Sequence, residues 1–406
     1  MSSTPPEPAT DADPPVIDLP IPPPGTMGPP VYYPRLRREC PLAKVRLPMG
    51  VTAWYATRYE DVRDLVADPR LIRPTINDWP PRPDRAAPDE SGLTTMMELN
   101  GPPHAALRRA LAEPFSVRSI RSRLPAIREA ADRLLDEFAA GDRPGDLVKG
   151  FLERFPLLVM CELVGIPYED RDYFLPKADA ALGALVTLEE GRKVTSQLRE
   201  YITALLEHKR REPADDVVTG LVHACERGAL DTERVVNFGL SMLIAGYRTS
   251  TMFLADSALA LLTEPGQYAR LRDHRDLMPG AVEELLRYVP MMNGTVVLQA
   301  VEEIELHGRT IHAGDAVLPV HAAANRDERV FADGDRLDLC RADNPHLTFG
   351  RGAHNCIGAH LARAQMTVCL EALFDRFPNL HIPEGRHPTW DDASPAKAPL
   401  TLPVSW

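Results

Sequence analysis

A short glycine-rich segment that carries one cysteine constrains this chain more than any other part of its sequence. Residues 349–363 read FGRGAHNCIGAHLAR, and apolar residues then recur at helical spacing from Ile357 to Val368. The glycines permit backbone angles and close approaches that a side chain would forbid, so a flat cofactor fits against such a loop. Cys356 lies just before the predicted helix, whose N-terminal amides favour a thiolate over a thiol. A thiolate in this position is suited to bind haem iron.

The alternative for a single cysteine among glycines is a small buried residue without chemistry, which is its more common role. The neighbouring residues argue against that alternative. The segment resembles the haem-binding signature of the cytochrome P450 family at Phe349, Gly350, Gly352, His354, Cys356, Gly358, Leu361, Ala362 and Arg363. The resemblance implies that the cofactor is haem b and that Cys356 is the axial ligand of its iron. It also implies the cytochrome P450 fold, a single large helical domain that encloses the haem, with a minor β region.

The chain divides into a proline-rich start and one large domain. Residues 1–30 contain many prolines and few large apolar side chains, which predicts a flexible tail. From residue 31 to residue 406 the apolar pattern predicts one catalytic domain in which helices dominate. Long helices are expected at 120–140, 153–164, 194–211 and 232–262, and short strands at 296–300, 303–306 and 316–320.

The overall charge restricts the classes of partner. A net charge of −12 argues against nucleic acid and against an acidic membrane surface, because both attract clustered cations. No apolar run reaches the roughly 18 to 20 residues that cross a bilayer, and the start of the chain lacks the order of a secretory signal. We therefore expect a soluble, cytoplasmic protein. The cysteines form no CxxC pair, which argues against structural zinc and a disulfide framework.

One acidic and two basic residues form a second candidate cluster. Glu284 and Arg287 lie three residues apart on one face of a predicted helix, where a carboxylate and a guanidinium can pair. In most helices such a pair is a solvated surface contact worth about 0.3 kcal/mol. By resemblance to the family, Arg336 completes a Glu-Arg-Arg network with them. That network would hold the cysteine loop without taking part in the redox chemistry.

A histidine and an arginine near residue 100 are candidates for binding the haem carboxylates. The segment NGPPHAALRRAL resembles the family helix that crosses the haem edge. His104 and Arg108 lie four residues apart, so both side chains aim at one anion, although a partly exposed histidine at a helix start is an equal alternative. The family usually has a further propionate-binding arginine before the strand that follows the Glu-Arg helix. Leu298 occupies that position here, so propionate binding must differ.

The predicted helix 232–262 resembles the family helix that passes over the oxygen-binding face of the haem. Ala245 and Gly246 are the small residues expected to leave room for oxygen and substrate. A glycine inside a helix costs up to about 1 kcal/mol, which asks for a packing or functional reason. The family has an acid before its threonine, whereas this chain has Arg248 before Thr249. Cleavage of dioxygen consumes protons, and an arginine cannot supply them as an acid does.

Four interpretations of this arginine stay open. Thr249 and Ser250 organise water for ordinary monooxygenation, with protons that enter by another route. Alternatively, Arg248 binds a substrate carboxylate or assists peroxide, by resemblance to fatty-acid peroxygenases in the family. A third interpretation is radical chemistry without oxygen insertion, such as coupling or ring closure. The fourth is an arginine that turns outward to a neighbouring carboxylate.

By resemblance, the substrate pocket is lined by segments on the oxygen side of the haem. The expected lining residues are Met96, Met97, Leu243, Met291, Met292, Asn293, Thr295 and Val296. Soft methionine side chains suit a sizeable apolar or aromatic ligand, although core packing explains any single methionine equally well. We therefore predict an oxidoreductase that acts on a small-molecule substrate, a secondary metabolite, by monooxygenation with dioxygen.

The resemblance also implies a redox partner. A ferredoxin or a flavoprotein reductase would supply electrons at the cysteine side, where Arg109, Arg351 and His360 offer local positive charge. Solvated surface cations are the simpler explanation of each of these residues. Two other functions compete with monooxygenation: oxidative coupling or peroxide-driven oxidation, and a non-catalytic haem sensor or carrier. Thr249 favours catalysis, because a sensor needs no oxygen-activating alcohol.

Overall fold

The computed structural model describes residues 14, 16–20, 22–47, 50–74, 96–182, 188–290, 296–390 and 397–406. Within them the helices are α1 (Tyr33–Glu39), α2 (Tyr59–Leu65), α3 (Gly101–Leu111), α4 (Val117–Ala139), α5 (Arg154–Val164), α6 (Arg171–Leu182), α7 (Leu188–Arg211), α8 (Val217–Glu226), α9 (Thr232–Ala245), α10 (Arg248–Thr263), α11 (Gln267–Asp273), α12 (Met278–Tyr288), α13 (His321–Ala324) and α14 (Ala359–Arg376). Shorter helical turns are η1 (Val148–Leu152), η2 (Tyr168–Asp170), η3 (Arg275–Leu277) and η4 (Gly352–His354). The strands are β1 (Val16–Asp18), β2 (Leu42–Arg46), β3 (Thr52–Ala56), β4 (Leu71–Ile72), β5 (Gly145–Asp146), β6 (Leu298–Ala300), β7 (Ile304–Leu306), β8 (Arg309–Ile311), β9 (Ala316–Pro319), β10 (Thr389–Trp390), β11 (Pro399–Thr401) and β12 (Pro403–Val404).

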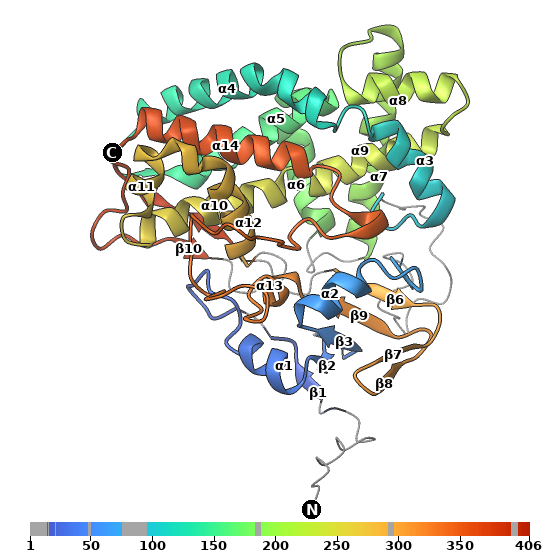
Figure 1. Ribbon diagram of the computed structural model, residues 1–406. Helices are drawn as coiled ribbons and strands as arrows, with labels where there is room; N and C mark the ends of the chain where they lie inside the picture. Colours follow the sequence, from blue (N-terminus) through green and yellow to red (C-terminus); the bar gives the residue numbers. More distant parts are fainter. Residues whose placement is uncertain are drawn as a thin grey trace, which may run out of the picture.

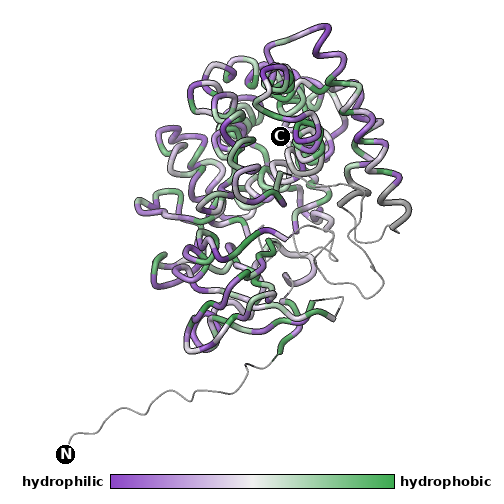
Figure 2. The backbone as a smooth tube through the Cα atoms, turned by 90° about the vertical axis from the view of Figure 1, so that its right-hand side faces the viewer, coloured by the Kyte–Doolittle hydropathy of each residue, from purple (hydrophilic) through white to green (hydrophobic). Residues whose placement is uncertain are grey.

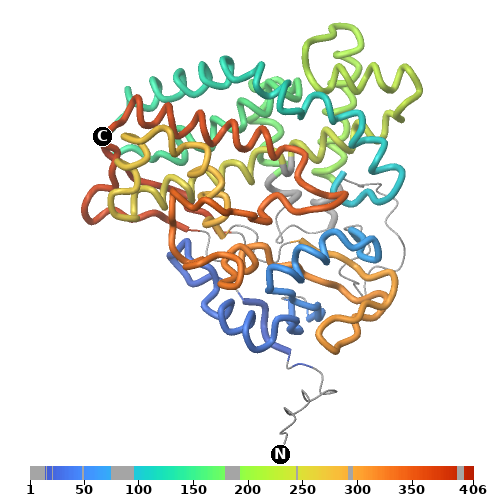
Figure 3. The backbone as a smooth tube through the Cα atoms, in the orientation of Figure 1, coloured from blue at the N-terminus to red at the C-terminus, as the bar shows by residue number. Residues whose placement is uncertain are grey.

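The helices form the larger part of the molecule and the sheet forms the smaller part (Figure 1). Helices α4 and α14 pack along each other at one edge of the helical part, as the tube in Figure 3 also shows. The short helices α1, α2 and α13 accompany the sheet. The mainly helical fold with a minor β region, expected from the sequence, is confirmed.

Side-chain caps mark the starts of three of the long or central helices. Ser116 precedes α4, Asp216 precedes α8 and Asp231 precedes α9, and each side-chain oxygen accepts a hydrogen bond from the backbone N–H three residues later. Such caps satisfy an amide that the first helical turn leaves without a partner. Together with apolar residues at helical spacing, the caps explain why these segments fold as helices.

Six strands form the main sheet, in the order β1-β2-β3-β9-β6-β4. Strands β3 and β9 run parallel, whereas β6 is antiparallel to both of its neighbours, β9 and β4. In the last pair Leu71 lies opposite Ala300 and Ile72 lies opposite Gln299. The strands expected at 296–300, 303–306 and 316–320 are therefore present as β6, β7 and β9.

Apolar residues form one large core among the helices and two smaller clusters on the two sides of the sheet. Apolar and polar stretches alternate along the chain in Figure 2. Among the described residues, no helix combines the length and the apolar character that a membrane crossing requires.

Part of the expected flexible tail belongs to the folded molecule. Strand β1 pairs in parallel with β2, and Leu19 N–H donates to the Arg46 carbonyl at 3.0 Å. Further along, Met27 packs against the helical core, and Lys397 donates to the Pro23 carbonyl. The boundary at residue 30 is therefore wrong for these described residues, because backbone pairing and apolar contacts order a segment that proline content alone marks as flexible.

The expected continuous helix 232–262 is divided in two. Helix α9 ends at Ala245 and α10 begins at Arg248, with Gly246 and Tyr247 between them. The Gly246 N–H still donates to the Met242 carbonyl at 2.9 Å, and a Cβ at position 246 would lie 2.6 Å from that same oxygen. The glycine is therefore required by close backbone packing at the break.

Candidate active site

The cysteine loop is a set of tight turns that ends at α14. The Cys356 N–H donates to the Phe349 carbonyl at 2.8 Å, and the Gly350 N–H donates to the Leu347 carbonyl at 2.8 Å. Gly350 and Gly352 have φ angles of 68° and 76°, a region that favours glycine. A side chain at Gly352 would also press on the backbone of Ala67, at 3.1 Å. The two glycines thus fix the path by which the chain reaches the cysteine.

Cys356 opens into a pocket of about 500 Å³ between α3, α12 and α14. The lining residues are Arg108, Ala112, Phe115, Ser116, Glu283, Asn344, His346, Phe349, Gly350, Asn355, Cys356, Ile357, Ala359, His360 and Arg363. Burial raises the pKa of the Cys356 thiol, while a hydrogen bond from the Gly358 backbone and the charges of Arg108 and Arg363 act against that rise. The surroundings therefore combine desolvation with donors that stabilise a thiolate once a metal binds it.

A salt-bridged carboxylate braces one wall of this pocket. Both Glu283 carboxylate oxygens accept hydrogen bonds from Arg363, at 2.6 and 2.7 Å, and His346 Nε2 lies 2.9 Å from the same group. Against the effect of burial, these bonds lower the pKa of Glu283 to about 2. The Arg363 guanidinium also stacks 4.6 Å above the Phe349 ring. Through Arg363, Glu283 holds the aromatic residue that begins the cysteine loop.

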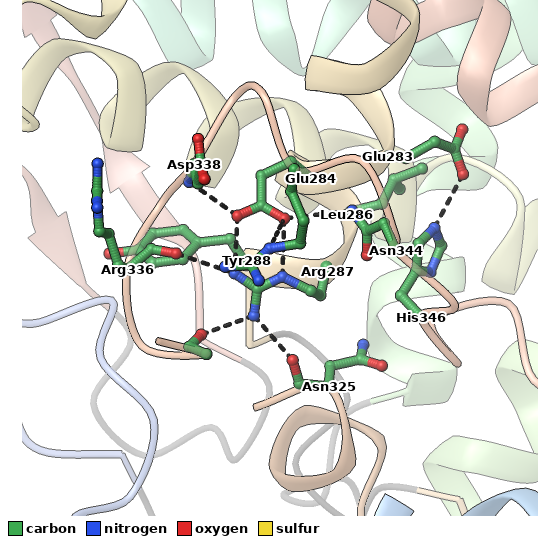
Figure 4. Close-up of polar contacts among 12 residues, drawn as sticks. Glu283, Glu284, Leu286, Arg287, Tyr288, Asn325, Arg336, Asp338, Asn344 and His346 are labelled. Carbon is green, nitrogen blue, oxygen red and sulfur yellow. Dashed lines mark hydrogen bonds and ion pairs between the residues drawn. The ribbon is translucent and has the colours of Figure 1, made fainter. Parts of the chain in front are cut away.

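Glu284 and Arg287 form a fully buried, bidentate ion pair (Figure 4). Arg287 Nε and Nη2 donate to the two Glu284 oxygens, each at 2.8 Å. The remaining Arg287 donors reach three backbone carbonyls, those of Asn325, Gly334 and Arg336. Both charges are thus paired and hydrogen-bonded, as a buried ion pair requires. The exposed helix contact, the alternative for this pair, is excluded.

The third member of the predicted Glu-Arg-Arg network is a different residue. Arg336 contributes only its backbone carbonyl, and its exposed side chain points away from Glu284 (Figure 4). The guanidinium that reaches Glu284 belongs to Arg341, whose Nε donates to Glu284 Oε2 at 3.0 Å. The prediction of the Arg336 side chain was therefore wrong. The turns between residues 333 and 341 bring the later arginine to the carboxylate.

A short relay of hydrogen bonds connects this ion pair to the cysteine loop. Asn325, whose carbonyl accepts from Arg287, has its side-chain oxygen bound to the Leu347 N–H at 2.7 Å. Its side-chain amide donates to the Thr348 hydroxyl, which in turn donates to the Leu286 carbonyl. These hydrogen bonds thus hold α12 and the start of the cysteine loop in a fixed position relative to each other.

The structure brings His104, Arg108 and His354 together beside the cysteine. The His104 and His354 rings stack, with centroids 4.2 Å apart. Arg108 donates to the carbonyl and to the side-chain oxygen of Asn355, next to Cys356. Burial and the charges of Arg108 and Arg73 lower the pKa of His104. These residues, expected to bind haem, therefore share one basic corner of the site.

Sequence reasoning missed two further members of this corner, Arg73 and His321. Arg73 follows β4, and burial lowers its pKa to about 10. His321 begins α13, and burial together with the charge of Arg73 lowers its pKa to about 4. Both lie far from the cysteine loop in sequence, and only the pairing of β4 with β6 and the position of α13 after β9 bring them here.

The residues of the oxygen side lie at the break between α9 and α10. Arg248 begins α10 and is partly buried, Thr249 is exposed and Ser250 is partly buried. Gly246 and Tyr247 separate them from Ala245, the last residue of α9. The small residues and the alcohols are therefore adjacent, at a point where the helix is interrupted.

The predicted pocket residues divide into three groups. Met96 and Leu243 pack in the helical core, with Leu243 completely buried. Met97 is half exposed and Val296 is partly buried, so both keep surface that a ligand can contact. The other predicted lining residues, Met291, Met292, Asn293 and Thr295, lie outside the described residues.

Comparison with known proteins identifies the family. The family model for cytochrome P450 matches residues 172–401. The chain belongs to the cytochrome P450 family. It is 40% identical over 380 residues to mycinamicin IV hydroxylase/epoxidase of Micromonospora griseorubida, which covers 92% of this chain and 94% of that protein. It is 37% identical over 378 residues to nocardicin C N-oxygenase of Nocardia uniformis subsp. tsuyamanensis, with coverage of 92% and 94%.

Solved cytochrome P450 structures have the same fold. The mixed-function P450 MycG aligns with a TM-score of 0.84 and 37% identity, over 97% of this chain and 100% of that one. The putative thioether synthase SgvP, involved in the tailoring of griseoviridin, aligns with a TM-score of 0.85 and 33% identity, over the whole of both chains. The fold and the enzyme class predicted from the sequence, a cytochrome P450 oxygenase, are confirmed, and the sensor alternative is not supported.

As a cytochrome P450, the chain takes haem b, held through a cysteine thiolate, and its residues fit this group. Cys356 would offer one thiolate to the iron from a pocket at the start of α14. His104, His354, Arg108 and Arg73 would offer positive or hydrogen-bonding groups to the two haem propionates. Among the described residues, no carboxylate contributes to the pKa shifts of Arg73, His104 or His354. The corner thus suits an anion that comes with the cofactor.

Proposed function

We propose that this cytochrome P450 inserts oxygen into a sizeable, largely apolar secondary metabolite, with electrons from a ferredoxin. The similarity to enzymes that act on elaborate natural products carries the proposal, since mycinamicin IV hydroxylase/epoxidase and nocardicin C N-oxygenase each align over 92% of this chain. The half-exposed Met97 supports it, because a flexible thioether side chain adapts to a large apolar ligand.

The residues of this chain would divide the work between the two sides of the cofactor. Haem with a thiolate ligand supplies the activation of dioxygen, because the thiolate pushes electron density towards the iron. On the cysteine side, Gly358 and Arg108 stabilise the thiolate charge. On the other side, the exposed hydroxyl of Thr249 would hold water and pass protons, a role that an alcohol performs by donating and accepting hydrogen bonds.

Substrate class and oxygen insertion are testable with the holoenzyme. Addition of the correct ligand to the ferric protein is expected to shift the haem absorption band, and a panel that contains macrolactones, terpenoids, cyclic dipeptides and aromatic polyketides would identify the class. With ¹⁸O₂, ferredoxin, its reductase and NADPH, the product should carry one labelled oxygen atom. An oxidised product without the label would refute monooxygenation.

Oxidative coupling or ring closure is the second candidate, and Arg248 favours it. An arginine stands where the family has an acid, directly at the α9–α10 break. SgvP, described as a putative thioether synthase, aligns over the whole chain, and this likeness supports a reaction other than hydroxylation as the second candidate. If the missing acid limits proton delivery, Arg248→Glu should increase the share of NADPH that leads to hydroxylated product. An unchanged or lower share would show that protons enter by another route.

A further inference from the structure

Leu298 begins strand β6, and Arg73 directly follows β4, the strand that pairs with β6. In the antiparallel pair β4–β6, Leu71 faces Ala300 and Ile72 faces Gln299. The same register, continued by one residue, sets Arg73 opposite Leu298. Residues directly opposite each other in an antiparallel pair point to the same side of the sheet. The side chain of Arg73 therefore starts from the position beside the one where the family has its propionate-binding arginine and this chain has leucine.

Asn100 fixes the backbone of Arg73. The Arg73 N–H donates to Asn100 Oδ1 at 3.0 Å, and Asn100 Nδ2 donates to the Arg73 carbonyl at 2.8 Å. Asn100 is also the residue that precedes α3, which carries His104 and Arg108. One side-chain amide thus ties the end of β4 to the start of the helix that lies along the basic corner.

Among the described residues, the Arg73 guanidinium has no carboxylate as a partner. Its Nε is buried and has no hydrogen-bond partner among the described residues. No carboxylate of the described chain offsets the desolvation that lowers the pKa of Arg73. Its charge acts on His104 and His321, both buried, so its neighbours are basic as well. A partly buried guanidinium among histidines costs free energy unless an anion binds there.

We propose that Arg73, which directly follows strand β4, supplies the propionate contact that Leu298 cannot make from strand β6. A haem propionate is the anion that this family brings to the corner formed by His104, His354 and Arg108, and the guanidinium fork binds a carboxylate through two hydrogen bonds. Compared with the usual arrangement in the family, the arginine comes from the neighbouring strand of the pair, and its charge would stay at the same edge of the haem. This assignment concerns cofactor binding and does not depend on the substrate or the reaction type.

The test compares three variants of the haem-loaded protein. Arg73→Gln removes the charge, Arg73→Lys keeps it without the fork, and Arg70→Gln is the control, since Arg70 precedes β4 and pairs with Asp68 at the surface. Two quantities are measured: the rate at which haem passes to an excess of apomyoglobin, and the midpoint potential of the iron. Thermal unfolding followed by circular dichroism establishes that each variant is folded.

Arg73→Gln should lose haem about tenfold faster than the parent, the factor that one charge-assisted hydrogen bond is worth. Its midpoint potential should fall, because the positive charge that stabilises the reduced form of the iron is removed. The rate of haem loss from Arg73→Lys should lie between those of the parent and of Arg73→Gln. Arg70→Gln should match the parent in both measurements. The proposal is overturned if Arg73→Gln keeps haem as firmly as Arg70→Gln, or if Arg73→Lys loses haem as fast as Arg73→Gln, which would indicate that Arg73 acts only in packing.

Discussion

Arg287 shows how a buried charge is made tolerable at the level of a single residue. Its guanidinium and the Glu284 carboxylate are completely buried, and hydrogen bonds from Arg341, Asn344 and the Asp338 N–H complete the shell of the carboxylate. Removing one partner of such a pair leaves an uncompensated charge and usually costs about 3–5 kcal/mol. The pair therefore holds α12 against the segment that leads to the cysteine loop.

The two arginines of that segment give a matched test. Arg341→Ala removes a donor to a buried carboxylate and should lower the free energy of unfolding by about 1.5–3 kcal/mol, the range for hydrogen bonds to charged groups. Arg336→Ala leaves the backbone carbonyl in place and should change it by no more than about 0.5 kcal/mol. Urea unfolding of both variants measures the difference. Equal losses, or a larger loss for Arg336→Ala, would contradict the assignment of Arg341.

Sequence reasoning located residues whose chemistry depends on near neighbours. Cys356 is expected from the glycine-rich loop together with its resemblance to the haem-binding signature, and Glu284 with Arg287 from their spacing on one helix together with the same family resemblance. Arg73 and Arg341 could not be located in this way. The position of Arg73 depends on the register between two strands more than 200 residues apart, and that of Arg341 on the turns of an irregular loop.

At the level of elements, the junction of α9 and α10 departs most from a simple pattern. Apolar residues continue at helical spacing across the junction, so periodicity alone predicts one helix. At the break, a Cβ on residue 246 would lie 2.6 Å from the Met242 carbonyl oxygen, a close approach that no periodicity describes. The three strands predicted between residues 296 and 320 are present as β6, β7 and β9, since each is a short β-type run between turn residues.

Two glycine substitutions separate this close contact from ordinary helix propensity. Gly246→Ala places a Cβ 2.6 Å from the Met242 carbonyl, so the backbone must shift and the free energy of unfolding should fall by about 1–3 kcal/mol. Gly220→Ala lies inside α8, where a Cβ meets no atom within 4 Å, and should raise it by about 0.5–1 kcal/mol. Denaturant unfolding compares the two. A stabilising Gly246→Ala would show that the break is not fixed by this contact.

Helix α10 also contains a buried acid whose stability effect depends on pH. Neither carboxylate oxygen of Asp256 has a hydrogen-bond partner among the described residues, and burial raises its pKa well above the usual value of 3.8. Above pH 3.8 the unfolded chain loses this proton before the folded one does, so folding binds a proton and stability falls as pH rises towards the folded pKa.

Replacing the acid removes that loss. Asp256→Asn should raise the unfolding temperature at neutral pH by more than it does near pH 3, below the unfolded pKa of 3.8, where both states largely keep the proton. Asp172→Asn, at an exposed position in α6, should have little effect at either pH. Thermal unfolding across this pH range measures both. A gain that is the same at all pH values would mean that Asp256 has the same pKa in the folded and the unfolded chain, so that burial does not raise it.

At the scale of the whole molecule, charge is unevenly distributed relative to the cofactor. The chain carries a net charge of −12, yet Arg109, Arg351 and His360 are exposed basic residues close in sequence to residues of the Cys356 pocket, and His360 lines that pocket. Glu283, the acid in that pocket, is neutralised by Arg363. An acidic electron donor would therefore be repelled by most of the surface and attracted near the cysteine, which favours productive encounters.

Electron transfer tests this distribution directly. The rate of the first electron from an acidic ferredoxin should decrease as salt rises, since screening acts over roughly 10 Å at 0.1 M. Arg109→Glu should lower the rate by about tenfold at low salt, within the range of electrostatic steering, and should weaken its salt dependence. Arg46→Glu makes the same change of charge on β2, in the sheet part of the molecule, and should leave the rate nearly unchanged. If both variants slow electron transfer equally, the rate depends only on the net charge of the protein, and the partner does not dock at the cysteine side.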